Sequence, residues 1–466
     1  MSDVVGWAAH SEAVARLRAS YDAIPAGAPV RLAKRTSNLF RVRSVASAPG
    51  LGVSGLGVSG LDVSGLGGVV ALDLASPAGP TADVQGMCTY EDLVDVTLPH
   101  GYIPYVVPQL RSITLGGAVT GLGIESTSFR NGLPHDSVLE MDVLTGAGEL
   151  VTTTPGEDLF DAFPNSYGSL GYATRIRIRL EKVPGYVDLR HLRFHDLDDL
   201  AKTLDVLVEQ GEHDGVRVDG LDGVVFEPGE CYLTLATWRQ DAPEKTSDYT
   251  GMDIYYRSLQ QRDTDTLTMY DYLWRWDTDW FWCSGAFGLK NPRVRRLWPR
   301  RWRRSDVYSR IVNLEGRYRV LARIDRLRGR PDRERVIQDI EVRVDRLVPF
   351  LRWFDEAIGM RPVWLCPLRA TRAWPSYPLE QEETYVNVGF WGTMPIDPGA
   401  RDGDKNRAIE AKVTELGGHK SLYSDAYYDR DTFSELYGLA NLTHVKQQTD
   451  PDNRLTGLYE KAVNRR

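Results

Sequence analysis

One glycine-rich stretch, TLGGAVTGLGIESTSFRNG at residues 114–132, constrains the possible folds of this chain more than any other feature. Glycine allows a backbone to approach a ligand closely and to adopt positive φ angles. Consecutive backbone N–H groups can then surround phosphate oxygens, and neighbouring hydroxyl groups add further donors. The residues that we expect to contact such a ligand are Thr114, Gly116, Gly117, Thr120, Gly121, Gly123, Glu125, Ser126, Thr127 and Gly132.

Two further loops have a composition that suits the same ligand. An earlier basic turn follows Lys34 and contains Arg35, Thr36, Ser37 and Asn38, which offer a cation and polar donors to a pyrophosphate. A later turn, YGSLG at residues 167–171, contributes Gly168 and Gly171. Each loop alone could be an ordinary tight turn, but three such loops together favour a ligand site.

The spacing of apolar residues predicts an α+β fold. An amphipathic helix is expected over residues 8–22, and another over residues 197–209. Between residues 69 and 180, short strand-like runs alternate with glycine-rich turns, as in VVALDL, TADVQGM, SVLEMDVL and ATRIRIRL. This pattern indicates mixed sheets rather than repeated βαβ units. A length of 466 residues suits two domains, and the pattern of short strand-like runs and glycine-rich turns changes near Pro184.

A five-residue repeat, LGVSGLGVSGLDVSGLGG at residues 51–68, contains the pattern GxGxxG twice. A dinucleotide-binding fingerprint needs a strand before these glycines and a helix after them. Neither is expected here, because no apolar run precedes the repeat and its glycines would not sustain a helix. We interpret the repeat as a surface loop that grew by duplication of a turn.

Composition excludes several classes of protein. A net charge of −8 argues against a general nucleic-acid binder. The four cysteines show no CxxC pair, which is typical of free thiols in a reducing compartment. We expect no signal peptide and no membrane span, because the chain has no apolar run of the required kind. We also expect no metal site, because His191 and His195 fall in a strand-like run. His419 is expected in a surface loop.

The order of the three loops resembles the PCMH-type FAD-binding domain of the vanillyl-alcohol-oxidase superfamily. Within that superfamily the chain resembles the Δ24-sterol-reductase-like branch in four later stretches: VIQDIEV (336–342), PVWLCPL (362–368), TYVNVGFWG (384–392) and SLYSDAYYDRDTF (421–433). The resemblance implies an N-terminal helix (1–24), a two-subdomain FAD-binding domain (25–185) and a mixed α+β substrate or cap domain (186–466). The C-terminal segment of the cap is expected to pack back on the flavin domain.

The chain differs from these families in two respects, and each difference leads to an expectation. The sterol enzymes have an N-terminal membrane anchor, whereas this chain is expected to be cytoplasmic and peripheral to the inner face of a membrane. Many superfamily members attach FAD through a histidine in the first loop, where this chain has Arg35-Thr36-Ser37-Asn38. The expected FAD is therefore noncovalent.

Within the branch, the chain most closely resembles bacterial flavin-dependent reductases that complete methyl-branched fatty acids. These enzymes use NADPH to reduce a 10-methylene group on a phospholipid acyl chain to the 10-methyl group of the tuberculostearic type. The resemblance leaves three alternatives open: a sterol-type Δ24 reductase, an FAD-linked oxidase of a small alcohol or hydroxy acid, and a flavin-bearing accessory subunit of a lipid methyltransferase. The chain has no second dinucleotide fingerprint, so NADPH would bind transiently or a partner would deliver the electrons.

Saturation of an alkene requires a hydride on one carbon and a proton on the other, so the protein must supply an acid. Our candidates are Tyr423 and Asp425, which a strand through residues 422–425 would place on one face, and Asp279. Asp271 and Tyr272 lie near Asp279 in the same motif. A Tyr–Asp hydrogen bond in the core is the alternative, and simpler, interpretation of the first pair.

Two unusual stretches follow one another after residue 269. YDYLWRWDTDWFWCSGAF (270–287) is rich in aromatic residues and could line an apolar tunnel for an acyl chain or form a domain core. PRVRRLWPRRWRR (292–304) has seven arginines, from Arg293 to Arg304, around Trp298 and Trp302. Arginine with tryptophan suits an anionic membrane surface. The alternatives are nucleic acid, which the acidic remainder of the chain disfavours, and a helix face with salt bridges.

Overall fold

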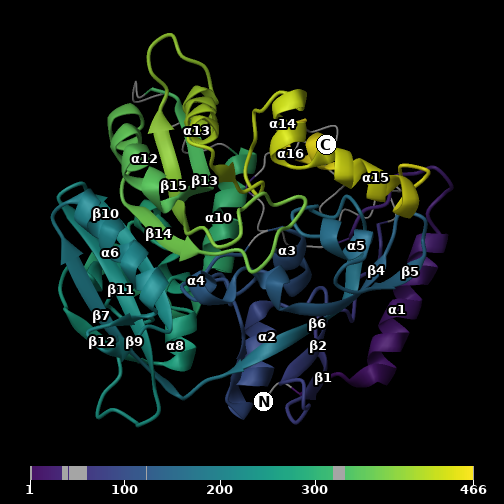
Figure 1. The fold of residues 1–466 in the computed structure, drawn as a ribbon, viewed down its shortest axis with the longest axis horizontal. Coiled ribbons are helices and arrows are strands. Elements are labelled where there is room, and N and C mark those ends of the chain that lie inside the picture. Colours follow the sequence, from purple (N-terminus) through teal and green to yellow (C-terminus); the bar gives the residue numbers. More distant parts are fainter. Residues whose placement is uncertain (1–2, 34–39, 41–59, 122, 319–330, 465–466) are drawn as a thin grey trace.

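The computed structural model describes residues 3–33, 40, 60–121, 123–318 and 331–464. Two antiparallel sheets with helices packed on them make up the molecule (Figure 1), so the α+β prediction is confirmed. The predicted ligand residues Arg35, Thr36, Ser37 and Asn38, and most of the repeat that begins at residue 51, lie outside the described residues.

The first sheet has six strands and contains the four runs predicted from the sequence. Alternation along its longest strand explains why it forms: Ile176 and Ile178 enter the core, while Arg175 and Arg177 point to the opposite face and pair with Asp83. Its strands in spatial order are β1 (Val69–Asp73), β2 (Thr81–Gln85), β6 (Tyr172–Lys182), β4 (Val138–Leu144) and β5 (Leu150–Thr153), and β3 (Tyr102–Pro104) also pairs with β6.

Short helices surround this sheet and complete what we call the first domain. The predicted helix over residues 8–22 is present as α1 and buries Ala13, Leu17 and Tyr21. Helix α2 begins after Thr89, whose side chain accepts a hydrogen bond from the Asp92 N–H. The helices are α1 (Gly6–Asp22), α2 (Tyr90–Thr97), η2 (Leu98–His100), α3 (Leu115–Thr120), α4 (Ser128–Asn131), η3 (Pro134–Ser137) and α5 (Asp158–Ala162).

The second sheet has eight strands, and we call the part built on it the second domain. Its strands in spatial order are β12 (Thr264–Thr268), β7 (Tyr186–Phe194), β11 (Glu230–Arg239), β10 (Gly220–Glu227), β14 (Val363–Leu368), β15 (Tyr385–Pro395), β13 (Arg333–Arg343) and β16 (His419–Lys420). A separate hairpin pairs β8 (Glu212–His213) with β9 (Val216–Arg217).

The two faces of the second sheet have different partners, and this difference positions the site. Helices α6 (Leu197–Gln210), α12 (Val344–Ala357) and α13 (Asp404–Glu415) cover one face and pack on Ile340, Leu365 and Val388. Helix α6 is the one predicted over residues 197–209. The opposite face carries Trp364 and Cys366, which join the apolar cluster of the first domain. This second face is therefore the one that meets the first domain.

A long connection between β12 and β13 carries the aromatic and arginine-rich stretches. It contains α8 (Met269–Leu273), η4 (Asp277–Asp279), η5 (Cys283–Phe287), α9 (Pro292–Leu297), η6 (Arg300–Trp302) and α10 (Ser305–Tyr318), and α7 (Tyr255–Ser258) precedes β12.

The C-terminal helices return to the first domain. They are α14 (Arg430–Leu436), α15 (Leu439–Thr449) and α16 (Leu458–Ala462). The Lys461 ammonium donates hydrogen bonds to the carbonyl oxygens of Tyr167 (3.0 Å) and Gly168 (2.8 Å), and the Ala147 N–H donates to Thr449 O at 3.0 Å. The C-terminal helix α16 therefore helps to hold the YGSLG loop in place.

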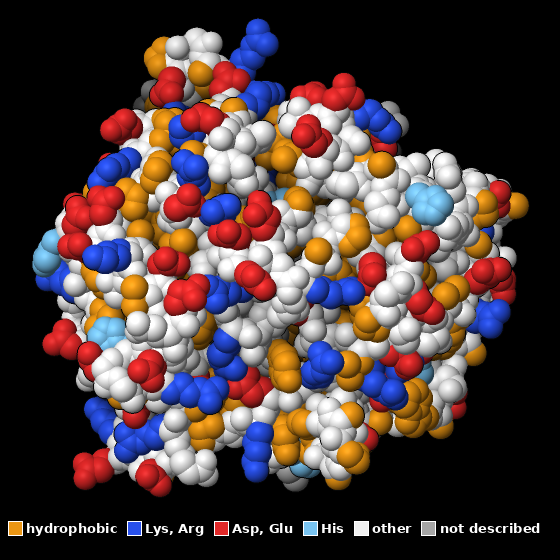
Figure 2. Space-filling view, viewed as in Figure 1, with side chains coloured by type: hydrophobic (Ala, Val, Ile, Leu, Met, Phe, Trp, Pro, Cys, Tyr) orange, Lys and Arg blue, Asp and Glu red, His pale blue; other side chains and the backbone are white. Residues whose placement is uncertain are grey.

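The described part of the chain contains no helix that is both long and apolar enough to cross a bilayer. On the face shown in Figure 2, acidic and basic side chains are interspersed, and small apolar areas lie between them.

Packing against the helix-covered face of the second sheet predicts a large stability effect at one position. Leu365 is fully buried between that sheet and its helices, so Leu365→Ala should lower the free energy of unfolding by about 2–5 kcal/mol. Leu297 is 85% exposed, and Leu297→Ala should change it by less than about 0.5 kcal/mol. Urea unfolding followed by far-UV circular dichroism measures both, and equal midpoints for the two variants would contradict this assignment of the core.

Candidate functional site

The glycine-rich stretch begins with a tight approach of α3 to the turn after β2. The Thr114 hydroxyl accepts a hydrogen bond from the Gly117 N–H at 3.2 Å, and the Gly116 N–H donates to Gly86 O at 2.9 Å. A Cβ at Gly116 would lie 2.5 Å from Gly86 O, so backbone packing requires glycine there. Gly117 differs: it is exposed, and the only atom within 4 Å of an added Cβ is the Thr114 hydroxyl oxygen, a side-chain atom at 2.9 Å. Gly117 therefore presents open backbone that a ligand can approach.

The other predicted glycines already have close protein neighbours. At each one an added Cβ would lie within 3.0 Å of another atom of the chain, and Gly132 and Gly168 also have φ angles of 71° and 73°. Internal packing thus accounts for these glycines, and their contact with a ligand stays a prediction. They are Gly121, Gly123, Gly132, Gly168 and Gly171.

The predicted hydroxyl donors are also used within the chain. Thr120 donates to Gly116 O at 2.7 Å, and Thr127 donates to Tyr105 O at 2.8 Å. The Ser126 hydroxyl is 2.6 Å from the Tyr272 hydroxyl, across the boundary between the two domains. These hydroxyls shape the loop.

Glu125 links the loop to the second domain. Its Oε1 lies 3.1 Å from Arg275 Nη2, which is also 2.9 Å from Asp222 Oδ2 of β10. All three side chains are buried, and desolvation raises the pKa of Glu125. The second carboxylate oxygen, Oε2, has no hydrogen-bond partner among the described residues. It is available to a donor on a ligand.

Strands β13 and β15 place a line of polar residues on the sheet face that meets the first domain. In the register, Asp339 is opposite Gly389, and Glu341 is opposite Asn387. Because side chains two residues apart share a face, Asp339, Glu341 and Asn387 lie on the same side of the sheet. Sequence reasoning missed these residues.

Tyr423, predicted as an acid, lies against this line of polar residues. Its hydroxyl accepts a hydrogen bond from Trp391 Nε1 at 2.9 Å and is hydrogen-bonded to Asp339. Asn387 Nδ2 donates to Asp339 Oδ1 at 3.1 Å. Burial and the nearby negative charge of Glu341 raise the pKa of Asp339 to about 7, and burial also raises the pKa of Tyr423. The Asp339–Tyr423 pair can therefore hold and release a proton near neutral pH.

Aromatic rings surround the Asp339–Tyr423 pair. Ring centroids of Phe281 and Trp282 lie 4.3 Å and 5.4 Å from that of Trp391, and Phe40 packs edge-on against Tyr423 at 5.8 Å. Phe40 also stacks on Trp280 at 5.7 Å. The aromatic stretch predicted either to line a tunnel or to form a core thus contributes both to the core and to this wall.

The structure places the other predicted acids differently. Asp279 is buried in an ion pair with Arg295 (2.6 Å) and accepts a hydrogen bond from Ser284 at 2.7 Å. The expected strand through residues 422–425 is wrong: these residues form a turn, in which Lys420 Nζ donates to the backbone oxygen of Asp425. Tyr423 and Asp425 therefore do not share a strand face, and catalysis by Asp279 or Asp425 stays a prediction.

The expectation for His419 is also wrong. It is buried on β16, where its Nδ1 lies 3.1 Å from Glu341 Oε2. The sequence did hold a signal for this region, because VIQDIEV places two carboxylates at alternate positions of an apolar strand. Buried carboxylates need partners, and these would have indicated a polar site on that strand face.

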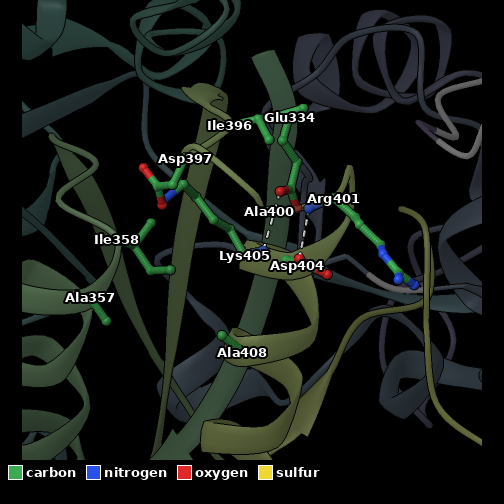
Figure 3. Close-up of a pocket in the computed structure, with 10 residues that line it drawn as sticks. All are labelled: Glu334, Ala357, Ile358, Ile396, Asp397, Ala400, Arg401, Asp404, Lys405 and Ala408. Atoms are coloured by element: carbon green, nitrogen blue, oxygen red, sulfur yellow. Dashed lines mark hydrogen bonds and ion pairs between the residues drawn. The ribbon is translucent and has the colours of Figure 1, made fainter. Parts of the chain in front are cut away.

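A cavity of about 200 Å³ opens elsewhere, at the ends of α12, α13 and β13 (Figure 3). Several of its charged groups have partners: Lys405 lies 2.7 Å from Asp397, and Glu334 accepts hydrogen bonds from the N–H groups of Lys405 and Asn406 at the start of α13. This cavity lies on the helix-covered side of the second sheet, away from Asp339.

Comparison with known proteins gives one family and several relatives. The family model for the FAD binding domain matches residues 27–154. The Delta(24)-sterol reductase of Rattus norvegicus is 25% identical over 388 residues, which cover 78% of this chain and 70% of that protein. The Homo sapiens protein of the same name is 23% identical over 401 residues, covering 81% and 73%. Cytokinin dehydrogenase 7 of Oryza sativa subsp. japonica is 30% identical over 185 residues, or 39% and 34%.

The site fits the group that this family binds. FAD has phosphates that need close backbone approach, as at Gly117, and ring N–H and ribityl O–H donors. The buried oxygens Glu125 Oε2 and Asn387 Oδ1 have no partner among the described residues, and both can accept from such donors. Residues 27–154 are therefore an FAD-binding domain of the PCMH type, and the chain is an FAD-linked oxidoreductase similar to the Delta(24)-sterol reductases and cytokinin dehydrogenases.

Proposed function

We propose that this protein is an FAD-dependent reductase that saturates a carbon–carbon double bond of a lipid. The proposed substrate is a phospholipid with a 10-methylene acyl chain, the product is the 10-methyl chain, and NADPH supplies the electrons. The relatives named Delta(24)-sterol reductase support reduction of an alkene on an apolar molecule. The observation that carries the proposal is the Asp339–Tyr423 pair beside an aromatic wall, because this reaction needs an acid in an apolar place.

The reaction balances with one proton from the protein. NADPH, a proton and the alkene give NADP⁺ and the saturated chain. Bound FAD would accept two electrons and a proton equivalent from NADPH and return them to the substrate as a hydride. The protein must deliver the second proton to the terminal CH₂ carbon. Positive charge then develops on C10, the more substituted carbon.

The Asp339–Tyr423 pair is suited to this proton transfer. An acid works best when its pKa lies near the working pH, and burial raises the pKa of Asp339 to about 7. Asp339, Tyr423 and Trp391 are each partly exposed, so a bound acyl chain could reach them. Trp391 and Phe281 would exclude water, and their π faces would favour the developing positive charge.

Three parts of the chain would hold FAD. The open backbone at Gly117 would face the pyrophosphate, together with Arg35, Thr36, Ser37 and Asn38 of the first loop. Glu125 and Asn387 would accept hydrogen bonds from the ribityl chain or the ring. None of these side chains is a histidine, which supports noncovalent binding.

A reaction with purified components tests the function. Anaerobic protein with NADPH and a phospholipid that bears a 10-methylene chain should yield the 10-methyl chain by mass spectrometry, and in D₂O the new methyl group should carry deuterium. Product formed only from a Δ24 sterol would favour the sterol alternative. Fast flavin reoxidation by oxygen with an alcohol substrate would favour an oxidase. Activity that appears only with an added lipid methyltransferase would favour the accessory-subunit alternative.

The open backbone at Gly117 predicts a specific loss of FAD. Gly117→Val should fold but purify without yellow colour, because the added side chain would occupy the approach to the pyrophosphate. Gly185→Val is the control: a Cβ there meets nothing within 4 Å, and the residue lies outside the glycine-rich stretch, so FAD should remain bound. Flavin absorbance per protein measures both. Acid precipitation of the parent should leave all the FAD in the supernatant, and flavin retained in the pellet would exclude noncovalent binding.

The Asp339–Tyr423 pair predicts a split between the two half-reactions. Asp339→Asn should slow alkene reduction at least about 100-fold, the size of a general-acid contribution, and Tyr423→Phe should slow it less. Flavin reduction by NADPH should stay near the parent rate in stopped flow, since that step needs no acid at the lipid. Tyr427→Phe, in the same segment, is the control and should retain activity. Equal loss of both half-reactions would indicate a structural role.

The raised pKa of Asp339 also predicts two pH dependences. Alkene reduction should fall as the pH rises through about 7, because the donor must be protonated. In the unfolded chain the carboxyl has its ordinary pKa near 3.8, so the folded state binds the proton more tightly. The parent should therefore lose stability relative to Asp339→Asn between about pH 4 and pH 7, with no further change above. Parallel melting temperatures for parent and variant across that range would contradict the raised pKa.

A further inference from the structure

The arginine-rich stretch at residues 292–304 contains two kinds of arginine. Arg295 and Arg303 are buried: Arg295 pairs with Asp279 at 2.6 Å, and Arg303 Nη2 donates to Arg295 O at 2.5 Å. Arg300 pairs with Asp248 at 2.6 Å. These three arginines build the segment or are neutralised within it. Contact with an anionic membrane stays a prediction for this stretch, and it can involve only the arginines that have no partner within the protein.

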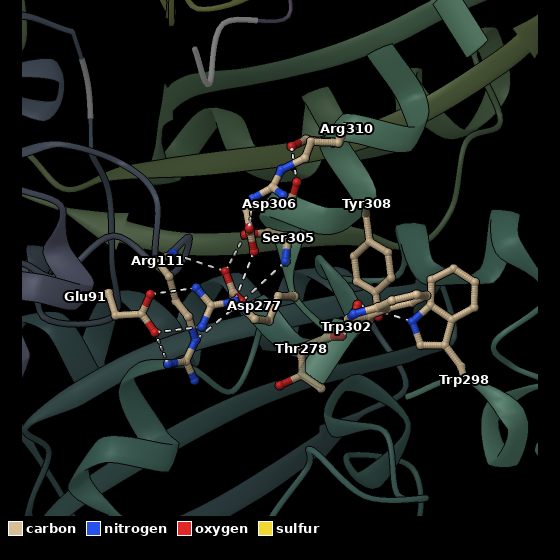
Figure 4. Close-up of polar contacts among 12 residues, drawn as sticks. Glu91, Arg111, Asp277, Thr278, Trp298, Trp302, Ser305, Asp306, Tyr308 and Arg310 are labelled. Atoms are coloured by element: carbon tan, nitrogen blue, oxygen red, sulfur yellow. Dashed lines mark hydrogen bonds and ion pairs between the residues drawn. The ribbon is translucent and has the colours of Figure 1, made fainter. Parts of the chain in front are cut away.

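The base of the segment is fixed to the first domain by the contacts in Figure 4. Glu91 of α2 accepts hydrogen bonds from Arg304 at 2.6 Å and Arg111 at 3.0 Å. Asp277 accepts from the Ser305 hydroxyl and, at 3.0 Å, from the Arg111 N–H. These contacts on both sides of the arginine-rich stretch therefore fix its position relative to the flavin domain.

Beyond this base, the segment presents an apolar surface with a basic rim. Leu297 is 85% exposed, Trp302 47% and Val294 37%. The three remaining arginines, Arg293, Arg296 and Arg301, are exposed, and none has a carboxylate partner among the described residues. We call these six residues the basic-apolar patch: Arg293, Val294, Arg296, Leu297, Arg301 and Trp302.

The chemistry of the basic-apolar patch fits an anionic bilayer better than nucleic acid. Unpaired guanidinium groups bind phosphate in either case. Nucleic acid, however, offers no apolar layer for a side chain as exposed as Leu297. A bilayer interface offers headgroup phosphates for arginine, an acyl boundary for leucine and an intermediate layer for the indole of tryptophan.

A chain of ring contacts connects the patch to the proposed acid. Trp302 lies edge-on to Trp298 (6.4 Å between centroids), and Trp298 lies 6.3 Å from Tyr308. Tyr308 shares a buried cluster with Trp280, and Trp280 stacks on Phe40, which contacts Tyr423. The patch is therefore connected to the residues around Asp339 by aromatic side chains in mutual contact.

We propose that the basic-apolar patch docks the protein on the surface of an anionic phospholipid bilayer, with Leu297 and Trp302 inserted and Arg293, Arg296 and Arg301 on headgroup phosphates. The inference deepens the proposed function, because the bilayer would supply the acyl substrate. Each arginine near such a surface increases partitioning about five-fold, so the three together contribute roughly 100-fold at low ionic strength. Salt should weaken the arginine contribution and leave that of Leu297 and Trp302.

Vesicle sedimentation of the FAD-loaded protein tests docking without any turnover. Vesicles of phosphatidylglycerol and phosphatidylcholine in equal parts should bind the parent, and phosphatidylcholine alone should bind it weakly. The triple variant Arg293→Gln/Arg296→Gln/Arg301→Gln should lose about 100-fold in partitioning. Leu297→Ser/Trp302→Ser should lose binding that persists in salt. The control Arg18→Gln/Arg335→Gln/Arg401→Gln removes three exposed arginines elsewhere and should bind as the parent does.

The outcomes separate docking from catalysis. FAD content should be the same in all variants, and detergent-dispersed substrate should restore the rates of the patch variants, because their catalytic residues are intact. Equal vesicle binding by the parent and the triple variant would overturn the proposal. So would binding to duplex DNA that depends on the three arginines but not on Leu297 and Trp302. Docking without alkene reduction by the parent would instead refute the proposed function alone.

Discussion

The buried guanidinium of Arg275 holds the two domains in the relation on which the site depends. It lies between a carboxylate of each domain, 3.1 Å from Glu125 and 2.9 Å from Asp222, while the indole N–H of Trp276 also donates to Asp222 at 3.0 Å. Removal of one partner from such a network leaves a charge buried and unpaired, which is strongly unfavourable. The network therefore fixes the flavin-binding loop against one face of the second sheet.

The carboxylates on this sheet face have different partners, and the partners separate structural carboxylates from a reactive one. Asp222 has Arg275 beside it, and Glu341 has His419 and the Ser421 hydroxyl. The hydrogen-bond partners of the Asp339 side chain among the described residues are uncharged, namely Asn387 and Tyr423. A cation lowers the free energy of the ionised form, and a neutral partner does so less, so desolvation dominates at Asp339 and its pKa rises. By this criterion Asp339 is the carboxyl on this face best suited to carry a proton.

Much of the fold could be predicted from local periodicity, whereas the candidate site depends on contacts between residues that are far apart in the sequence. Alternation of Ile176 and Ile178 with arginines predicted β6, and the glycine-rich stretch predicted an FAD-binding loop. The acid pair could not be found in this way, because Asp339 comes from β13 and Tyr423 from a turn whose shape depends on Lys420. Similarly, the sequence of the arginine-rich stretch did not reveal that Arg295 is buried, because its partner Asp279 is brought to it only by the fold.

Under the proposed function, the apolar surroundings of Asp339 account both for its raised pKa and for the choice of an apolar substrate. The pKa of Asp339 is high because burial disfavours the charged carboxylate, which lies close to Trp391 and its aromatic neighbours. The same rings would accept an acyl chain without loss of hydrogen bonds, whereas a polar substrate would bring water and lower that pKa. Asp339 would therefore work as a proton donor for substrates that bring no bound water into the site. Delivery from a bilayer at the basic-apolar patch, which ring contacts connect to Tyr423, would meet that condition.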